Sequence, residues 1–430
     1  MNRRNALLAA LAALALGGCI DDESFVQPGT TPNERFFRRY IALGNSLTAG
    51  WMSGGINDST QHLAYPVLLA DRANAGFIVP ALAMPGCPPP LLGVLETDTA
   101  GVPVLEDDRV DGGDGGTCLL REQPAPEFIQ NLAVPGAKVA DAVDIDRSGN
   151  ASNPLTTLIL GGMSQTEALS RFQPTFVTSW LGNNDALAAA LRGDTTLLTP
   201  VDTFEFYHTR VAQSISATGV LGAALIGVLD VTLAPLLQPG LYYWVADSLG
   251  FAPRPLRVVD GDTVRITVND NCAPTDPDTG ELNPLSLNEV SWLVYSDTSV
   301  KEISCDPDAE YVLTLAESQA IVERVDDFNA LIEEAASQRT WAYVDATTVL
   351  GSQLQGSGAD NRLRLCRFLD NDLTLAEMVT VVTSRCPHPS APNFFGSLVT
   401  YDGIHMSAAA HEVMADGIAA EIESIYDLTL

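Results

Sequence analysis

Short apolar runs that stop at a glycine turn recur along this chain and constrain its fold more than any other feature. Three such runs cover residues 40–43, 128–134 and 176–181, and they stop at turns that contain Gly44, Gly136 and Gly182. Further apolar runs at 223–231 and 341–345 lie among segments with helical periodicity. This alternation predicts a parallel α/β sheet, in which functional residues gather where the strands end.

Three segments carry helix signals. Residues 64–75 have a helical pattern, and residues 314–332 begin with a capping box formed by Thr314 and Glu317. The tail from Ser407 places four apolar residues on one helical face, namely Met414, Ile418, Ile422 and Ile425. These segments are predicted to form amphipathic helices.

Ser46 stands in the turn after the first predicted strand, where a nucleophile would be exposed. A serine hydroxyl becomes nucleophilic when a base removes its proton. Among the five histidines, His405 is the best candidate base, because Asp402 lies three residues earlier and can orient the imidazole. The plain alternatives are a helix N-cap for Ser46, a turn residue for Asp402 and a surface histidine for His405.

Two other turns that follow predicted strands contain candidate hydrogen-bond donors for the oxyanion of a tetrahedral intermediate. Asn184 follows the strand at 176–181 and carries an amide NH₂ group. Gly136 lets a substrate approach its backbone N–H closely, and the N–H of Ser46 completes the set. Asn184 alone is equally compatible with a turn residue.

Four sequence blocks together resemble the SGNH (GDSL-type) hydrolases. They are Gly44-Asn45-Ser46-Leu47, Asn131-Leu132-Ala133-Val134-Pro135-Gly136, Gly182-Asn183-Asn184-Asp185 and Asp402-Gly403-Ile404-His405. The resemblance implies a flavodoxin-like three-layer α/β/α sandwich with a parallel central sheet and an ester-cleaving activity. It also implies a catalytic triad of Ser46, Asp402 and His405, and an oxyanion hole of Ser46, Gly136 and Asn184. Asn45 stands where the family usually has Asp, but this position is not a triad member, so we expect activity to survive.

The leading functional hypothesis is an esterase or lipase that needs no cofactor. A carbohydrate or peptidoglycan O-deacetylase, or an acyltransferase, would use the same residues with another acceptor. A catalytically inactive surface lipoprotein that binds glycans or lipids is the third hypothesis, and the intact candidate triad argues against it. The expected partner is therefore a small-molecule, lipid or glycan ester.

Residues 235–310 do not follow the strand–helix alternation and are predicted to form a small β-rich cap insertion that bears on substrate specificity. The segment contains the aromatic residues Tyr242, Tyr243 and Trp244, which either line an acyl pocket or pack in the cap. Its acidic loop at 276–281, like the one at 107–114, could hold calcium. Neither loop has the EF-hand spacing, so solvated loops are the better interpretation and no metal site is predicted.

The charge balance limits the classes of partner. The formal net charge is -31, and hydrophobic residues make up 46% of the 430 residues, which is enough for a large core. Phosphate recognition needs clustered cations, so nucleic acid is not an expected partner. The same charge opposes electrostatic docking to anionic lipid.

The N-terminus has the pattern of an export signal. Arg3 and Arg4 precede an apolar run at 6–16, which is too short to span a bilayer. The following Leu16-Gly17-Gly18-Cys19 resembles the lipobox of bacterial lipoproteins, which implies a signal peptide at 1–18 and a lipid on Cys19. An ordinary signal peptide with a chance cysteine is the alternative. We expect residues 19–37 to be a tether, residues 38–430 to be the hydrolase domain, and the protein to be exported and anchored in the bacterial cell envelope, at the outer membrane.

Six cysteines remain once Cys19 is set aside, and an even number in an exported protein indicates disulfides. Proximity in the sequence favours the pairs Cys87–Cys118, Cys272–Cys305 and Cys366–Cys386. Six cysteines allow 15 connectivities, so the pairing is a hypothesis. No cysteine lies in a CxxC or Cys/His cluster, so zinc is not expected.

Overall fold

A four-stranded parallel sheet lies at the centre of the molecule, in the order β1-β4-β5-β13. The computed structural model describes residues 31–97, 103–105, 108–112, 121–145, 153–250, 256–259, 262–276, 279–297, 299–354, 374–387 and 394–430. The sheet strands are β1 (Tyr40–Gly44), β4 (Phe176–Trp180), β5 (Gly222–Ile226) and β13 (Ala342–Val344). Four of the predicted strands are thereby confirmed, although the strand predicted over 223–231 ends at Ile226.

The fifth predicted strand, at 128–134, is not a regular strand. It runs along the outer edge of β1 and forms one isolated parallel bridge, between Asn131 and Ala42. The Ala42 N–H donates to Gln130 O at 2.9 Å, and the Leu132 N–H donates to Ala42 O at 2.8 Å. The Asn131 side chain turns inward and donates to Thr48 O at 2.8 Å. The stretch therefore still delivers Gly136 to the edge of the sheet at which β1 ends.

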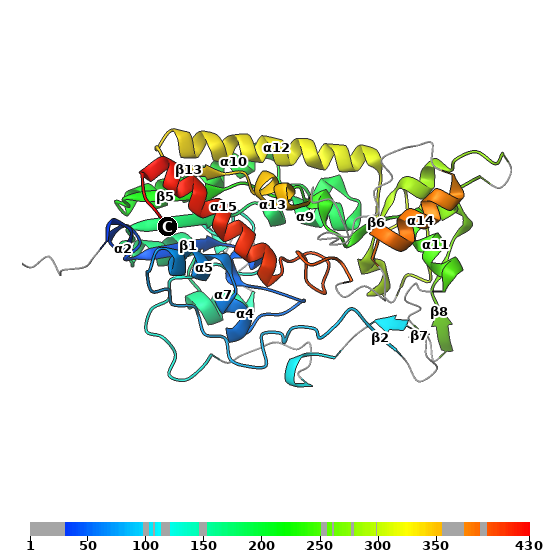
Figure 1. The fold of residues 1–430 in the computed structure, drawn as a ribbon, viewed down its shortest axis with the longest axis horizontal. Coiled ribbons are helices and arrows are strands. Elements are labelled where there is room, and N and C mark those ends of the chain that lie inside the picture. Colours follow the sequence, from blue (N-terminus) through cyan, green and yellow to red (C-terminus); the bar gives the residue numbers. More distant parts are fainter. Residues whose placement is uncertain are drawn as a thin grey trace, which may run out of the picture.

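Helices cover both faces of the sheet and produce three layers (Figure 1). One face is covered by α8 (Gln165–Ser170), α9 (Asn183–Arg192), α10 (Val201–Ala217) and α12 (Leu315–Ser337). The other face is covered by α5 (Tyr65–Arg72), α13 (Ala346–Leu354) and α15 (Ala408–Tyr426). Successive β1 residues point to opposite faces, so Ile41 and Leu43 join one core cluster while Tyr40 and Ala42 join the other. The fold is the α/β/α sandwich that the sequence predicts.

The predicted helices are confirmed, but one residue predicted on the buried face of the C-terminal helix is exposed. Thr314 caps α12 and forms the capping box with Glu317. In α15, Met414, Ile418 and Ile422 are fully buried, but Ile425 is 44% exposed. Tyr426 takes the sheet-facing position in this last turn instead: its hydroxyl donates to Ala223 O in β5 at 2.8 Å and its ring contacts Phe176, so the neighbouring Ile425 lies off the buried face.

We expect Phe328→Ala to destabilise the domain by about 3–5 kcal/mol, because it removes a buried ring from the contact between α12 and α10. The Phe328 ring stacks on Phe204 with centroids 4.0 Å apart, and both residues are 0% exposed. Urea unfolding measures the loss. Phe206→Ala on α10 is the matched control, since Phe206 is 47% exposed, and its expected cost is about 1 kcal/mol or less. Equal costs for the two variants would contradict this packing.

The domain begins earlier than the sequence predicts. Within the predicted tether at 19–37, residues Pro32–Phe36 form helix α2, and Thr31 caps it. Phe37 is fully buried, and Phe36 packs against Phe176 and Tyr426. Two adjacent aromatic residues bury enough apolar surface to hold this segment against the sheet, so the described part of the tether belongs to the folded domain.

Most of the elements formed by residues 235–310 lie in a lobe beyond one end of the central sheet (Figure 1). Its strands are β6 (Leu237–Pro239), β7 (Leu256–Val259), β8 (Asp262–Arg265), β9 (Thr267–Val268), β10 (Glu289–Ser291) and β11 (Glu302–Ile303), and its α-helix is α11 (Gly240–Leu249). β6 and β10 form a small antiparallel sheet with β12 (Val312–Leu313). The lobe is therefore rich in short strands, and α14 (Leu375–Arg385) packs against its helix.

The remaining described elements are short. They are α3 (Ser46–Ala49), α4 (Asp58–His62), α7 (Pro154–Leu160), β2 (Leu95–Thr97) and β3 (Pro103–Leu105). Among the described residues, no helix combines the length and the apolar character needed to cross a bilayer.

Candidate active site

Ser46 is the first residue of the short helix α3, directly after β1. Asn45 caps this helix, and its Oδ1 accepts a hydrogen bond from the Leu47 N–H at 3.0 Å. A Cβ at Gly44 would meet Thr48 Oγ1 at 2.1 Å and Trp180 O at 3.0 Å, so only glycine fits this tight turn. The turn thus fixes the Ser46 side chain at the carboxyl edge of the sheet, and Asn45 acts locally, as expected from its side chain.

His405 lies between Ser46 and Asp402, although 359 residues separate it from the serine. Its Nε2 is 2.9 Å from Ser46 Oγ, and its Nδ1 is 2.8 Å from Asp402 Oδ2. A carboxylate accepts hydrogen bonds, so the Nδ1 atom carries the proton and Nε2 offers a lone pair to the serine hydroxyl. The structure brings together the three residues that the sequence predicts as a triad.

Five donors surround the Asp402 carboxylate. Oδ2 accepts from His405 Nδ1 and from the Gly54 N–H at 2.7 Å. Oδ1 accepts from the N–H groups of Ile404 and His405 at 3.0 and 2.9 Å, and from Thr400 Oγ1 at 3.1 Å. Burial alone would raise the pKa of this carboxyl, but the adjacent His405 and these hydrogen bonds hold its pKa well below the usual range. The group is therefore a fixed anion behind the imidazole.

The two other predicted oxyanion donors have different placements. Asn184 lies in the first turn of α9 and borders the same cavity as Ser46 and His405. Its Nδ2 donates to Ala137 O at 3.0 Å, which connects it to the loop that contains Gly136. Gly136 has a φ of +82°, but it lines a neighbouring hollow and is not among the residues that border this cavity.

Asp185 supports the same loop, a role that the sequence analysis missed. Its Oδ2 accepts from the Val139 N–H at 2.9 Å, and its Oδ1 accepts from Thr199 Oγ1 at 2.8 Å. Burial raises the pKa of this carboxyl to about 6, although both hydrogen bonds and the charge of Lys138 oppose the rise. The only sequence signal was its place directly after Asn184 in the third block.

We expect Asp185→Asn to change the pH dependence of stability. The pKa of Asp185 rises from 3.8 to about 6 on folding, so folding takes up a proton and the wild type loses stability as pH rises through this window. The variant cannot titrate here. The free energy of unfolding of the variant minus that of the wild type should therefore rise by about 1.4 kcal/mol between pH 5 and pH 8. Urea titrations across this range measure it, and a difference that does not change with pH would contradict the assignment.

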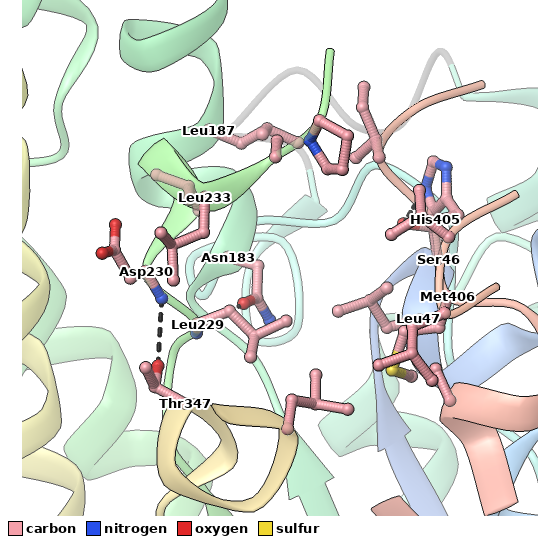
Figure 2. A pocket seen from close by; sticks show the side chains of 18 of the residues that line it. Ser46, Leu47, Asn183, Leu187, Leu229, Asp230, Leu233, Thr347, His405 and Met406 are labelled. Atoms are coloured by element: carbon pink, nitrogen blue, oxygen red, sulfur yellow. Dashed lines mark hydrogen bonds between the residues drawn. The ribbon is translucent and has the colours of Figure 1, made fainter. Parts of the chain in front are cut away.

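A cavity of about 110 Å³ opens in front of Ser46 and His405. Figure 2 shows Ser46, His405, Leu47 and Met406 on one side of it. The opposite side is formed by the chain that follows β5, from Leu229 to Pro235, and by α13. The sequence analysis did not identify this opposite wall.

The predicted cap insertion contributes little to the described part of this cavity. Of the described residues at 235–310, only Pro235 borders it. Tyr242 and Tyr243 are buried in the lobe and donate to the carbonyl groups of Pro387 and Val290, so they pack rather than line this cavity. The lobe contacts the triad loop instead, since the Leu236 N–H donates to Gly403 O at 3.0 Å.

The described residues test part of the disulfide prediction. Cys272 and Cys305 form a disulfide. Cys87 and Cys386 are also disulfide-bonded, but their predicted partners Cys118 and Cys366 lie outside the described residues, as does Cys19. Within the described ranges, no group of three His, Cys, Asp or Glu residues is arranged to hold a metal ion.

The fold and the site define a class of α/β proteins with a serine, a histidine and an aspartate joined by hydrogen bonds at the carboxyl edge of a parallel sheet. The sequence matches the GDSL-like lipase/acylhydrolase family over residues 40–418, so the chain belongs to this family of hydrolases. A comparison with curated proteins gave no match.

Solved structures also show similarity to this chain at low sequence identity. LAE5, an alpha/beta hydrolase enzyme from the metagenome of Lake Arreo, is 12% identical over 90% of this chain and 95% of its own, with a TM-score of 0.35. The acetylxylan esterase Axe2 from Geobacillus stearothermophilus is 11% identical over 89% and 93%, with a TM-score of 0.33. A putative GDSL-like lipase from Parabacteroides merdae is 9% identical over 89% and 94%, with a TM-score of 0.35. The family assignment rests on the sequence match.

Proposed function

We propose that this protein hydrolyses carboxylic esters through Ser46, His405 and Asp402. The observation that carries the proposal is the continuous hydrogen-bond chain from Ser46 Oγ to His405 Nε2 at 2.9 Å and from His405 Nδ1 to Asp402 Oδ2 at 2.8 Å. In this arrangement a base is in contact with the nucleophile and an anion orients the base, which is the requirement of serine acyl transfer.

The first half of the reaction forms an acyl-enzyme. His405 Nε2 takes the hydroxyl proton as Ser46 Oγ attacks the ester carbonyl, and Asp402 stabilises the imidazolium that results. The Ser46 N–H, at the start of α3, has no acceptor within the helix and faces the developing oxyanion together with Asn184 Nδ2. The resemblance adds the Gly136 N–H as a third donor, although Gly136 lines the neighbouring hollow and not the cavity that Ser46 and Asn184 border. The C–O bond then breaks, and the alcohol leaves with the proton from His405.

The second half releases the acid. A water molecule gives its proton to His405 Nε2 and attacks the acyl carbonyl, and the proton returns to Ser46 Oγ as the ester bond to the enzyme breaks. Every proton in this cycle is held by Ser46, His405, water or substrate. The proposed cycle therefore requires no cofactor.

Hydrolysis of p-nitrophenyl butanoate by the purified protein tests the proposal. We expect turnover that a chelator such as EDTA does not reduce. A folded protein that releases no p-nitrophenol from any ester between acetate and dodecanoate would contradict it.

We further propose that the protein is exported and anchored in the cell envelope by a lipid on Cys19, on the basis of the lipobox-like Leu16-Gly17-Gly18-Cys19. Cells fed radiolabelled palmitate should label the wild-type chain and leave Cys19→Ser unlabelled. Equal labelling of the two chains would contradict the anchor.

A further inference from the structure

The cavity beside Ser46 has a polar end and an apolar end. Ser46, His405 and Asn184 stand at the polar end. Across the hollow, Leu229 and Leu233 project from the chain after β5 (Figure 2). Leu350 of α13 and Leu187 of α9 also line the cavity.

Asp230 and Thr347, the polar residues of the wall opposite Ser46, make hydrogen bonds to the protein. Asp230 Oδ1 accepts from the N–H and the hydroxyl of Thr232 at 3.0 and 2.6 Å. Thr347 Oγ1 accepts from the Asp230 N–H at 3.1 Å. Asn45 and Asn183 also border the cavity. Their amide oxygens accept from the N–H groups of Leu47 and Leu229, and their amide nitrogens have no hydrogen-bond partner but are buried below the cavity surface. A ligand at this end therefore meets chiefly hydrocarbon.

The charge of the lining indicates a neutral ligand. No lysine or arginine is among the described residues that border the cavity, and Asp230 is the one carboxylate among them. The net charge of the chain is -31, which adds to the repulsion of an anionic group. A chain that ends in a carboxylate or phosphate would lose its hydration here without finding a cation.

The side on which the alcohol leaves indicates that the apolar end of the cavity holds the acyl part of an ester. The leaving alcohol takes its proton from His405 Nε2, so it departs on the His405 side. Figure 2 shows His405 and the Leu229–Leu233 wall on opposite sides of the hollow. With the carbonyl carbon at Ser46 Oγ, the acyl chain extends toward the leucines.

The size of the cavity limits the length of that chain. The volume is about 110 Å³. An apolar cavity of about 150 Å³ admits the six carbons of one benzene molecule, so this smaller one accommodates about four carbons of a flexible chain beyond the ester carbonyl, which corresponds to an acid of about four to six carbons.

We propose that the cavity is the acyl site and that the preferred substrates are esters of neutral, saturated acids of about four to six carbons. This proposal rests on the proposed ester hydrolysis and adds the substrate class to it. It makes Leu233, on the turn after β5, a specificity-determining residue. Acetyl esters fit the reactive end but leave the leucine wall unused.

A series of p-nitrophenyl esters from acetate to dodecanoate tests the proposal. In the wild type, kcat/KM should rise about fourfold for each added methylene up to butanoate or hexanoate, and then stop rising. Leu233→Trp fills the cavity and should lower kcat/KM for hexanoate at least tenfold while changing that for acetate less than threefold. Leu233→Ala should move the best substrate to longer chains, which keeps the test informative if the larger side chain disturbs folding.

Leu315→Trp is the matched control, because Leu315 is 63% exposed at the start of α12, away from the cavity, and this variant should keep the wild-type profile. A wild-type profile that falls from acetate to butanoate would overturn the acyl site and leave ester hydrolysis standing. If Leu233→Trp instead lowered kcat/KM only in a series of acetate esters with increasingly long alcohols, the cavity would be the alcohol site. That result would also overturn the acyl site and leave ester hydrolysis standing. Failure to hydrolyse every ester would overturn the proposed function together with the acyl site.

Discussion

Ser46→Ala is expected to lower kcat for p-nitrophenyl butanoate by about 10⁴-fold or more, since removing a serine nucleophile eliminates the covalent route entirely. The hydroxyl contributes one hydrogen bond, to His405 Nε2, and the residue is 8% exposed at the border of a cavity. The free energy of unfolding should therefore change by less than about 1 kcal/mol. Single-turnover kinetics and urea unfolding measure the two quantities separately.

Ser170→Ala is the matched control for this variant. Ser170 is an exposed serine at the end of α8 whose hydroxyl donates only to Glu167 O. The control should retain full activity. Residual activity of Ser46→Ala above one hundredth of wild type would show that another group performs the attack.

Asp402→Asn is expected to lower kcat by about 10⁴-fold, because it reverses the tautomer of His405. Both carboxylate oxygens accept N–H donors, so either orientation of the new amide places its NH₂ group against at least two of them. If the NH₂ group faces His405 Nδ1, the ring proton moves to Nε2 and points at Ser46. The imidazole then cannot take the serine proton.

Thr400→Val separates this electrostatic effect from a general loosening of the loop. It removes the hydroxyl that donates to Asp402 Oδ1 and accepts from the Ser53 N–H, but it leaves the carboxylate and its four other donors in place. We expect about a tenfold loss of kcat, the equivalent of one hydrogen bond. Comparable losses in the Thr400 and Asp402 variants would contradict the tautomer argument.

The sequence predicts the sheet and the principal side chains of the site, and the reason is geometric. Parallel strands end at one edge, so residues that follow Gly44 and Gly182 must meet in space whatever happens between them. Asp402 and His405 are close in the chain and share one loop, so their pairing requires little tertiary information. The 2.9 Å approach of His405 Nε2 to Ser46 Oγ depends on long-range packing and could only be expected from the resemblance to a family.

The supporting contacts could not be predicted in the same way. Gly54 and Thr400 act on Asp402 through a backbone N–H and a single hydroxyl, which leave no pattern in a sequence. Asp185 is buried by contacts with Val139 and Thr199, which are distant in the chain. Such partners become visible only when the loops are placed in three dimensions.

The wall opposite Ser46 comes chiefly from a segment that the sequence analysis did not single out. Residues 235–310 attract attention because they break the strand–helix pattern, yet the described wall comes mainly from the turn just before them, at 229–234. Pro235 is the one described residue of 235–310 that borders the cavity. That turn follows β5 at the same sheet edge as Ser46, so the rule for strand ends already indicated it. The apolar run at 223–231 instead suggested one long strand, which concealed the point at which β5 ends and the cavity begins.

Covalent labelling with a fluorophosphonate tests the central claim most directly. The reagent reacts with a serine that an adjacent base activates, and mass spectrometry of the digested protein locates the adduct. The proposed function predicts one phosphonate on the peptide that contains Ser46 in folded wild type, and none in Ser46→Ala. A folded wild type that remains unlabelled, or an adduct on any other residue, would contradict the assignment of Ser46 as the nucleophile.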